Sequence, residues 1–246
     1  MLSPFPGSWW SASFWLAAIL AVAGCATPSM PDFRSPSPPV GETRVDPGLV
    51  LDRFARDQAR RRTPRWSQWR LSGVLDMDTE VNKRRNRFVL DGTGTTRARL
   101  AVYGPFQQVA SRLLLDGGVM QLEESRNGAR KRVPATAAGM ESLIGLALPP
   151  ERLLEVFLGQ AATPTALHVR PDGTLWGPTS RGEWLRVGPA SGLLLERRGR
   201  TSGGHMYAVG YRWAAIPGGL HMPAQVEIRL GQDAKVEMDS GQWTFN

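Results

Sequence analysis

Cysteine and histidine are scarce in this sequence of 246 residues, which has one cysteine, Cys25, and three histidines. A single cysteine cannot build an internal disulfide framework or a thiolate metal cluster. The histidines, His168, His205 and His221, fall on what we predict to be separate strands, without metal-ligand spacing. We therefore expect no metal site and a structural role for each histidine.

Catalytic motifs are lacking as well. The glycine-rich run from Asp91 to Thr95 has no lysine of the kind that a phosphate-binding loop needs, so we interpret it as a hairpin turn. Serines such as Ser111 have no elbow motif and no histidine nearby. We predict that the protein has no catalytic residues, is not an enzyme and uses no cofactor.

The first 24 residues lack charge altogether. Their apolar run, Phe14 to Val22, has the length of a signal-peptide core and is too short to span a membrane. It leads into Val22-Ala23-Gly24-Cys25, which resembles a lipobox: an apolar residue and two small ones before the cysteine that takes the lipid. We predict that residues 1–24 are a lipoprotein signal peptide and that Cys25 carries covalent lipid. An ordinary signal peptide cleaved at a neighbouring small residue is the alternative.

Lipid on Cys25 predicts a location. Each buried methylene contributes about 0.8 kcal/mol, so several acyl chains make a durable anchor. The residues after Cys25 are Ala26 and Thr27, without the aspartate that favours retention in the inner membrane. We predict a protein anchored in the outer membrane with its body in the periplasm.

Charge points to the class of partner. The formal net charge is +8, and residues 1–24 contribute none of it, so the mature body is basic. Basic proteins attract nucleic acid, anionic lipid head groups and polyanionic glycans. Export favours the last two, and we predict no nucleic-acid partner.

Composition divides the mature chain into a tether and one domain. Residues 25–45 are rich in proline and serine, which is typical of a flexible tether. Residues 46–246 have the length of a single domain. Asp46-Pro47 provides an N-cap and a proline for the first turn, which predicts an amphipathic helix over 47–62. We expect its Arg60-Arg61-Arg62 run to be a solvated end.

From Trp69 onward, apolar and polar residues alternate in short runs separated by glycine turns, which predicts antiparallel strands. The Asp116-Gly117-Gly118 turn joins two of them. Helical spacing interrupts this pattern over 136–148 and 150–158, on either side of Pro149-Pro150. The order of helix, strands, two short helices and strands predicts an α+β fold, a twisted antiparallel sheet with helices on one face.

Several short stretches, in this order, resemble the LolB family of outer-membrane lipoproteins, which receive other lipoproteins from a periplasmic carrier. They are a tryptophan-and-glycine strand, Trp69–Gly73; a strand ending in a proline loop, Tyr103–Phe106; an acidic residue before Leu-Ile-Gly, Glu141–Gly145; an apolar helix ending in Leu-Gly, Pro150–Gly159; and the final strands, Pro223–Phe245. Glu155-Val156-Phe157 departs from the family, which often has a tryptophan there.

The resemblance implies an incomplete antiparallel β-barrel, a strongly curved sheet whose concave face is capped by helices. It also implies an apolar cavity for acyl chains. The candidate cavity and lid residues on the two short helices are Leu143, Ile144, Leu153, Leu154 and Phe157. The same residues could instead form a solid core.

The resemblance further implies that Pro105 and Phe106 form a membrane-insertion loop. We predict that Phe106 is exposed, because Gln107 and Gln108 give its ring no apolar neighbour in sequence. The alternative is a ring folded back onto the core.

The function implied is that of a receptor. A monomeric, LolB-like protein would accept lipoproteins from a LolA-like periplasmic carrier, hold their acyl chains and insert them into the outer membrane. Two alternatives stay open: a periplasmic module that senses or binds lipids or lipoproteins, and a structural envelope lipoprotein without transfer activity.

Overall fold

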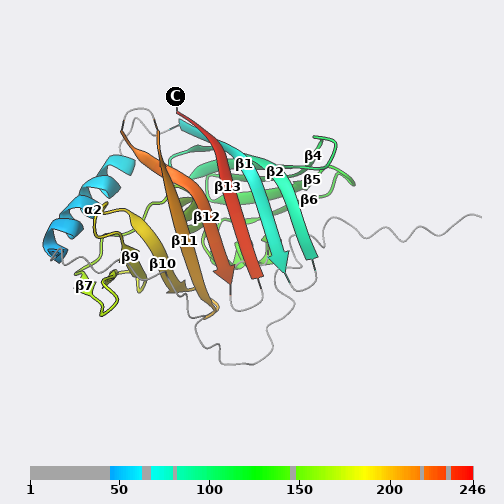
Figure 1. The fold of residues 1–246 in the computed structure, drawn as a ribbon. Coiled ribbons are helices and arrows are strands. Elements are labelled where there is room, and N and C mark those ends of the chain that lie inside the picture. Colours follow the sequence, from blue (N-terminus) through cyan, green and yellow to red (C-terminus); the bar gives the residue numbers. More distant parts are fainter. Residues whose placement is uncertain are drawn as a thin grey trace, which may run out of the picture.

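The computed structural model describes residues 45–62, 68–79, 82–144, 148–216, 219–230 and 234–245. Within these ranges the chain forms three helices and one sheet of thirteen strands, in the order that the sequence predicted (Figure 1). The helices are α2 (Pro47–Arg61), α3 (Ala137–Ile144) and α4 (Pro150–Phe157). The strands are β1 (Gln68–Thr79), β2 (Asn82–Thr93), β3 (Arg97–Tyr103), β4 (Val109–Asp116), β5 (Val119–Glu124), β6 (Arg130–Pro134), β7 (His168–Val169), β8 (Leu175–Pro178), β9 (Trp184–Val187), β10 (Leu194–Arg200), β11 (Met206–Ala215), β12 (His221–Leu230) and β13 (Ala234–Phe245).

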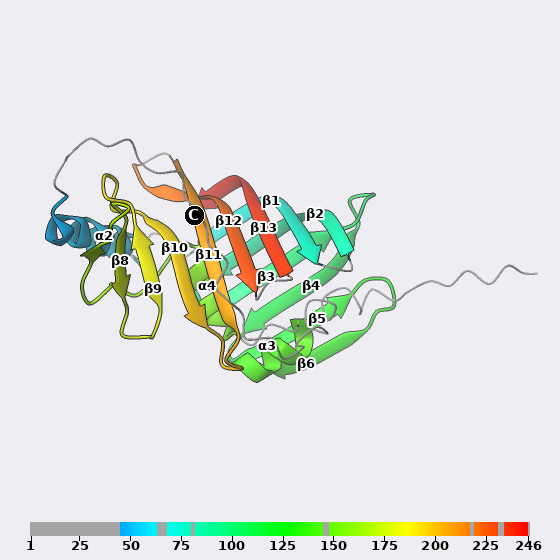
Figure 2. The same ribbon diagram turned by 60° about the horizontal axis from the view of Figure 1, so that its bottom comes forward.

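The sheet is open and antiparallel. Its strand order is β6-β5-β4-β3-β2-β1-β13-β12-β11-β10-β9-β8-β7, and no ladder joins β6 to β7 in the part of the chain that the structure describes. The first and last long strands, β1 and β13, pair at the centre, so the two halves of the chain meet there. Figures 1 and 2 show the sheet bending along its length. An open antiparallel sheet with separate helices is thus confirmed.

Local sequence signals define several element ends. Asp46 caps α2 by accepting a hydrogen bond from the Gly48 amide at 2.8 Å, and Pro47 occupies the first turn. The helix ends at Arg61, one residue before the predicted end. The two-residue turn Gly117-Gly118 joins β4 to β5 with φ values of 56° and 81°, which glycine adopts without steric cost.

The turn predicted over Asp91–Thr95 lies further along the chain. Asp91 to Thr93 end β2, and residues 94–96 form the turn. Gly92 lies under the ring of Trp69, where an added Cβ would come within 2.2 Å of the ring, and the Asp91 carboxylate contacts Arg70 on β1 at 2.5 Å. These cross-strand contacts extend β2 through residues that local turn chemistry would assign to a loop.

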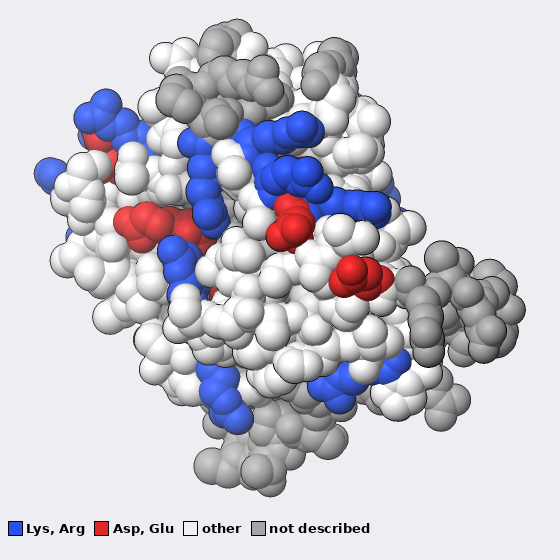
Figure 3. Space-filling model, turned by 90° about the vertical axis from the view of Figure 1, so that its left-hand side faces the viewer, with Lys and Arg blue, Asp and Glu red and all other residues white. Residues whose placement is uncertain are grey.

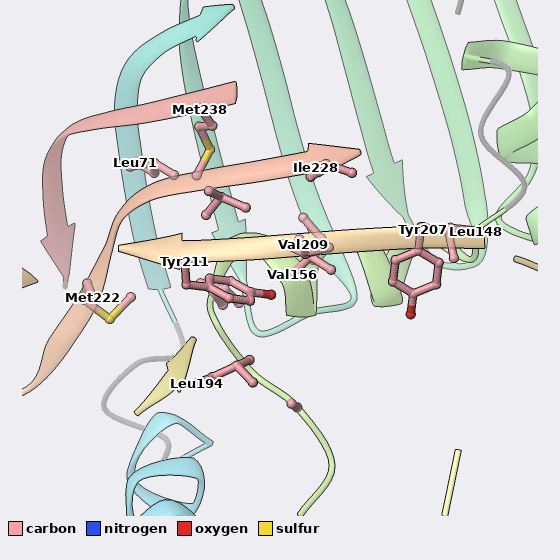
Figure 4. Packing of buried hydrophobic residues seen from close by; sticks show 14 of the residues in the cluster. Leu71, Leu148, Val156, Leu194, Tyr207, Val209, Tyr211, Met222, Ile228 and Met238 are labelled. Carbon is pink, nitrogen blue, oxygen red and sulfur yellow. The ribbon is translucent and has the colours of Figure 1, made fainter. Parts of the chain in front are cut away.

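The core lies between the sheet and the short helices. α3 packs on β5 and β6, and α4 packs on β12. Figure 4 shows Val156 of α4 in one cluster with Val209 and Tyr211 of β11 and Ile228 of β12. All four are at least 94% buried, so apolar burial holds α4 on the sheet.

Candidate functional site

Phe106 projects from a tight hairpin loop between β3 and β4. The residue is 88% exposed, so its predicted exposure is confirmed. The Gly104 amide donates to the Gln108 carbonyl at 2.8 Å, and the Gln107 amide donates to the Gly104 carbonyl at 3.0 Å. The Phe106 amide is satisfied by the side-chain oxygen of Gln108 at 3.0 Å. The loop therefore presents an apolar ring on a hydrogen-bonded support.

Backbone geometry fixes the direction of this loop. Gln107 has a φ of 60°, a left-handed conformation that costs a residue with a side chain roughly 1–2 kcal/mol. Pro105, at the loop's second position, restricts φ to about −65°. An added Cβ on Gly104 would lie 2.8 Å from the side-chain Nε2 of Gln108 and would displace the end of that flexible side chain. The chain keeps a strained residue next to Phe106 and holds the ring away from the core.

The candidate lid residues pack into the core. Leu143 of α3 and Leu154 of α4 are each 5% exposed, while Leu153 and Phe157 are partly buried against the same cluster. Ile144 ends α3, and its side chain lies outside the described part of the structure. The structure therefore brings four of the five predicted side chains to the helix–sheet boundary.

Cys25, the predicted signal peptide and all but the last residue of the predicted tether also lie outside the described residues. Among the helices described, none is both long and apolar enough to cross a bilayer. Of the histidines, His168 lies in β7 and His221 in β12, but His205 lies in the loop before β11, so its prediction as a strand residue was wrong. Within the described ranges, no group of three or more His, Cys, Asp or Glu could hold a metal ion.

A buried ion-pair network, which the sequence analysis missed, connects α4 to the sheet. Arg197 of β10 is fully buried, with its Nε 2.7 Å from Oε1 of Glu183. Arg152 of α4 contacts the other oxygen of Glu183 at 3.1 Å. Glu155, also on α4, lies 3.5 Å from Arg197 and 2.9 Å from Arg181. Through Arg152 and Glu155, the ion pairs thus hold α4 against the β8–β9 turn and β10.

A change of register explains why the network was missed. The run Glu196-Arg197-Arg198 is typical of an exposed strand, but a bulge between Leu194 and Glu196 shifts the pairing. Arg197 is then paired with Leu185 and Val209, both buried, and shares their face of the sheet. Only the close spacing of three charged residues after an apolar run could have signalled this site.

Glu183 and two buried tyrosines, Tyr207 and Tyr211, have shifted pKa values. Burial acts to raise the pKa of Glu183, but the charge and hydrogen bond of Arg197 outweigh it and hold the pKa below its usual 4.5. Burial raises the pKa of Tyr211 to about 12, against the opposing charge of Arg197. Burial also raises the pKa of Tyr207, whose hydroxyl donates to Glu183. At neutral pH the carboxylate is charged and both phenols are neutral.

The basic end of α2 is not simply solvated, which corrects the sequence interpretation. Arg61 is 4% exposed, pairs with Asp57 at 2.7 Å and lies over the Trp213 ring at 4.4 Å. It also donates to the His221 carbonyl at 2.6 Å, so it joins α2 to β11 and β12. On the side of the molecule that carries α2 and β7–β10, basic side chains cover more surface than acidic ones (Figure 3).

Comparisons with known proteins identify the fold. No family model and no curated protein matches this chain. A LolA superfamily protein from Nitrosomonas europaea matches with a TM-score of 0.53 at 9% identity. An outer membrane lipoprotein-sorting protein domain from Vibrio parahaemolyticus matches at 0.54 and 8%, and a DUF1329 family protein from Desulfovibrio piger at 0.56 and 11%. Each match covers 82% of this chain and 94% of the other.

The fold is therefore that of LolA superfamily proteins. At 8–11% identity, this likeness shows the fold alone.

Proposed function

We propose that this protein is a LolB-like receptor, anchored in the outer membrane through lipid on Cys25. It accepts lipoproteins from a LolA-like periplasmic carrier, shelters their acyl chains between sheet and helices, and inserts them into the outer membrane. The reaction is a transfer without covalent chemistry, and the receptor acts as a monomer. The observation that carries the proposal is Phe106, an exposed aromatic ring on a hydrogen-bonded loop.

Phe106 supports a role at the membrane because the transfer of an exposed apolar ring from water to an apolar environment is favourable. Moving it into the lipid interface gains roughly 1.5–3 kcal/mol. The side chain is 88% exposed, so nearly all of that gain is available on contact with a bilayer. The loop's own hydrogen bonds hold the ring outward, so no refolding is needed before insertion.

The helix–sheet boundary supports a role in holding acyl chains. Leu154 and Val156 of α4 lie on the apolar cluster, and Leu153 and Phe157 are only partly buried beside it. Rotation of the partly buried Leu153 and Phe157 side chains would open this apolar surface to a lipid tail while α4 keeps its ion pairs to Glu183 and Arg197. The tail would then replace the side-chain contacts that are lost. Transfer along such a path avoids exposing each methylene to water at a cost of about 0.8 kcal/mol.

The test is a transfer assay with Phe106→Glu. A carrier loaded with radiolabelled lipoprotein is mixed with the Cys25→Ala protein, and label is followed to the protein and then to liposomes. We expect Phe106→Glu to accept label but to deliver it at least tenfold more slowly, because a charged side chain resists burial in the interface. Phe106→Leu, which keeps an apolar side chain, should retain delivery.

Leu49→Glu is the matched control, since Leu49 is 57% exposed on α2 and lies outside the loop. It should leave delivery unchanged. An equal loss of delivery rate in Leu49→Glu and Phe106→Glu would contradict a specific role of the Phe106 loop in insertion. If no label moves from the carrier to the unmodified protein, the receptor function itself is wrong.

A structural envelope lipoprotein without transfer activity is the second candidate, supported by the burial of Leu143 and Leu154 in a packed core. Such a protein needs no opening at α4. An apolar fluorescent probe separates the two functions: strong emission on binding supports the receptor, and no emission together with no transfer supports the structural role.

A further inference from the structure

A cleft of about 1090 Å³ lies at the β7–β11 end of the sheet, far along the strand order from the Phe106 loop. It is bounded by the start of α4, the turn between β7 and β8, and strands β8 to β11. In an antiparallel sheet with this strand order, the β3–β4, β8–β9 and β10–β11 connections emerge at the same end. The cleft therefore includes two connections at the end of the sheet that also carries Phe106, whereas its β7–β8 turn, with Arg170, emerges at the opposite end of the short strands β8 and β9.

The lining of this cleft is strongly basic. Six arginines line it against three acidic residues, which leaves a surplus of three positive charges. The arginines are Arg152, Arg170, Arg181, Arg186, Arg198 and Arg200, and the acids are Asp172, Glu183 and Glu196. A concave basic surface concentrates anions, because its walls limit screening by water.

Two of the arginines are held in place by one carboxylate. Glu196 is 4% exposed, and Arg186 on β9 and Arg198 on β10 both form ion pairs with it. Arg198 also lies over the ring of Trp176, 4.8 Å from its centroid. One negative charge thus orients two guanidinium groups, leaving the three groups together with a net positive charge.

Two further arginines have no carboxylate partner in the described part of the structure. Arg170 is exposed in the β7–β8 turn, and Asp172 beside it uses its carboxylate to accept hydrogen bonds from Thr174. Arg200 donates to the carbonyl of Gly204 at 3.2 Å. Their charges remain available to a ligand, and planar guanidinium groups bind phosphate oxygens in pairs.

Aromatic rings give the cleft an apolar part. Trp184 is 44% exposed and is paired with Arg198 in the register of β9 and β10, so the two side chains share one face. A flat, half-exposed ring next to guanidinium groups suits a ligand that joins a phosphate to a carbon skeleton, more than it suits a free inorganic anion.

We propose that this cleft binds a phosphate-bearing head group, and that its source is an anionic phospholipid. The arginines contact the phosphate, and Trp184 contacts the glycerol backbone. The choice of a lipid over a soluble phosphate ester rests on the proposed function, which brings the end of the sheet that carries Phe106 to a bilayer. Binding at the cleft itself requires neither Phe106 nor transfer.

The test uses the Cys25→Ala protein of the transfer assay, without detergent, and two probes. Glycerol 3-phosphate is titrated with tryptophan fluorescence as the signal, and binding to phosphatidylglycerol nanodiscs is compared with binding to phosphatidylcholine nanodiscs. The variant is Arg170→Ala with Arg200→Ala. Its matched control is Arg97→Ala with Arg130→Ala, which removes two arginines that are 69% and 72% exposed elsewhere and lowers the charge equally.

We expect the unmodified protein to bind glycerol 3-phosphate and to prefer phosphatidylglycerol. The cleft variant should lose roughly 100-fold in affinity for both probes, because each charge-assisted contact contributes roughly tenfold. The control pair should stay within about twofold, as expected for charges outside the site. If glycerol 3-phosphate binds but phosphatidylglycerol nanodiscs are not preferred, the cleft is a phosphate site and the phospholipid as its ligand is wrong.

Three results would overturn the proposal that this cleft binds a phosphate-bearing head group. The first is an equal loss of affinity in the cleft variant and the control pair, which would indicate general attraction to a basic surface. The second is no binding of either probe, and the third is nanodisc binding that is abolished by Phe106→Glu but unaffected by the arginine substitutions. The third result leaves the proposed function intact, so failure of one proposal is distinguishable from failure of the other.

Discussion

Replacing Arg197 with methionine tests whether the buried ion pairs hold α4 on the sheet. Methionine keeps much of the side-chain volume but removes a guanidinium that is fully buried and 2.7 Å from Glu183. Removing one partner of a buried pair costs about 3–5 kcal/mol, because the other charge is left without compensation. Glu183 keeps Arg152 at 3.1 Å, so we expect the lower end, about 3 kcal/mol.

This loss can be measured as a function of pH. For a chain of this size, about 3 kcal/mol corresponds to a fall in melting temperature of roughly 6–12 °C. The folded-state pKa of Glu183 lies below its usual 4.5, so its contribution is present above pH 4.5 and is lost as the pH falls through the folded-state value. In Arg197→Met the opposing guanidinium charge is gone, so Glu183 binds a proton at a higher pH than in the unmodified protein, and this proton relieves the unpaired buried charge. The stability difference between Arg197→Met and the unmodified protein should therefore shrink between pH 7 and pH 4 in urea unfolding.

Arg97→Met is the control. Arg97 pairs with Asp116, but their side chains are 69% and 74% exposed, and such surface pairs contribute about 0–1 kcal/mol. A loss of under about 1 kcal/mol of unfolding free energy in Arg197→Met would contradict a role of the ion pairs in holding α4. The same loss at both pH values would contradict it too, since a buried unpaired carboxylate must respond to protonation.

Two further predictions concern packing and ionisation. Gly73→Ala should destabilise the protein by roughly 1–3 kcal/mol, because the added Cβ would lie 2.0 Å from the Asp239 carbonyl oxygen on β13. The control is Gly210→Ala, whose Cβ would have no atom within 4 Å and which should be neutral in thermal unfolding. Equal effects of the two substitutions would contradict the close approach at Gly73. In an absorbance titration, Tyr211 should stay protonated at pH 11, since burial raises its pKa to about 12. Its neutral phenol adds stability that is lost as the pH rises above 10, and a tyrosinate signal from all three tyrosines near pH 10 without unfolding would refute this.

Features that depend on neighbours in the sequence were predictable. The Asp46-Pro47 cap begins α2, Gly117-Gly118 forms its hairpin, and alternating residues form strands, because each depends on backbone sterics or hydrogen bonds within a few residues. The exposure of Phe106 belongs to the same class, since a proline turn with polar neighbours leaves the ring no local apolar contact. The open antiparallel sheet followed from the order of these elements.

Features that depend on register and long-range contact were decided only by the tertiary structure. A one-residue bulge turns Arg197 inward, and Trp213, 152 residues from Arg61, covers an arginine that local pattern assigns to solvent. The arginine-lined cleft gathers residues from α4 and four strands, none of which carries a binding motif by itself. The alternation within a strand specifies its two faces, but pairing across the sheet determines which charged side chain is buried and which side chains meet. The contact free energies that decide this pairing arise between segments far apart in the chain.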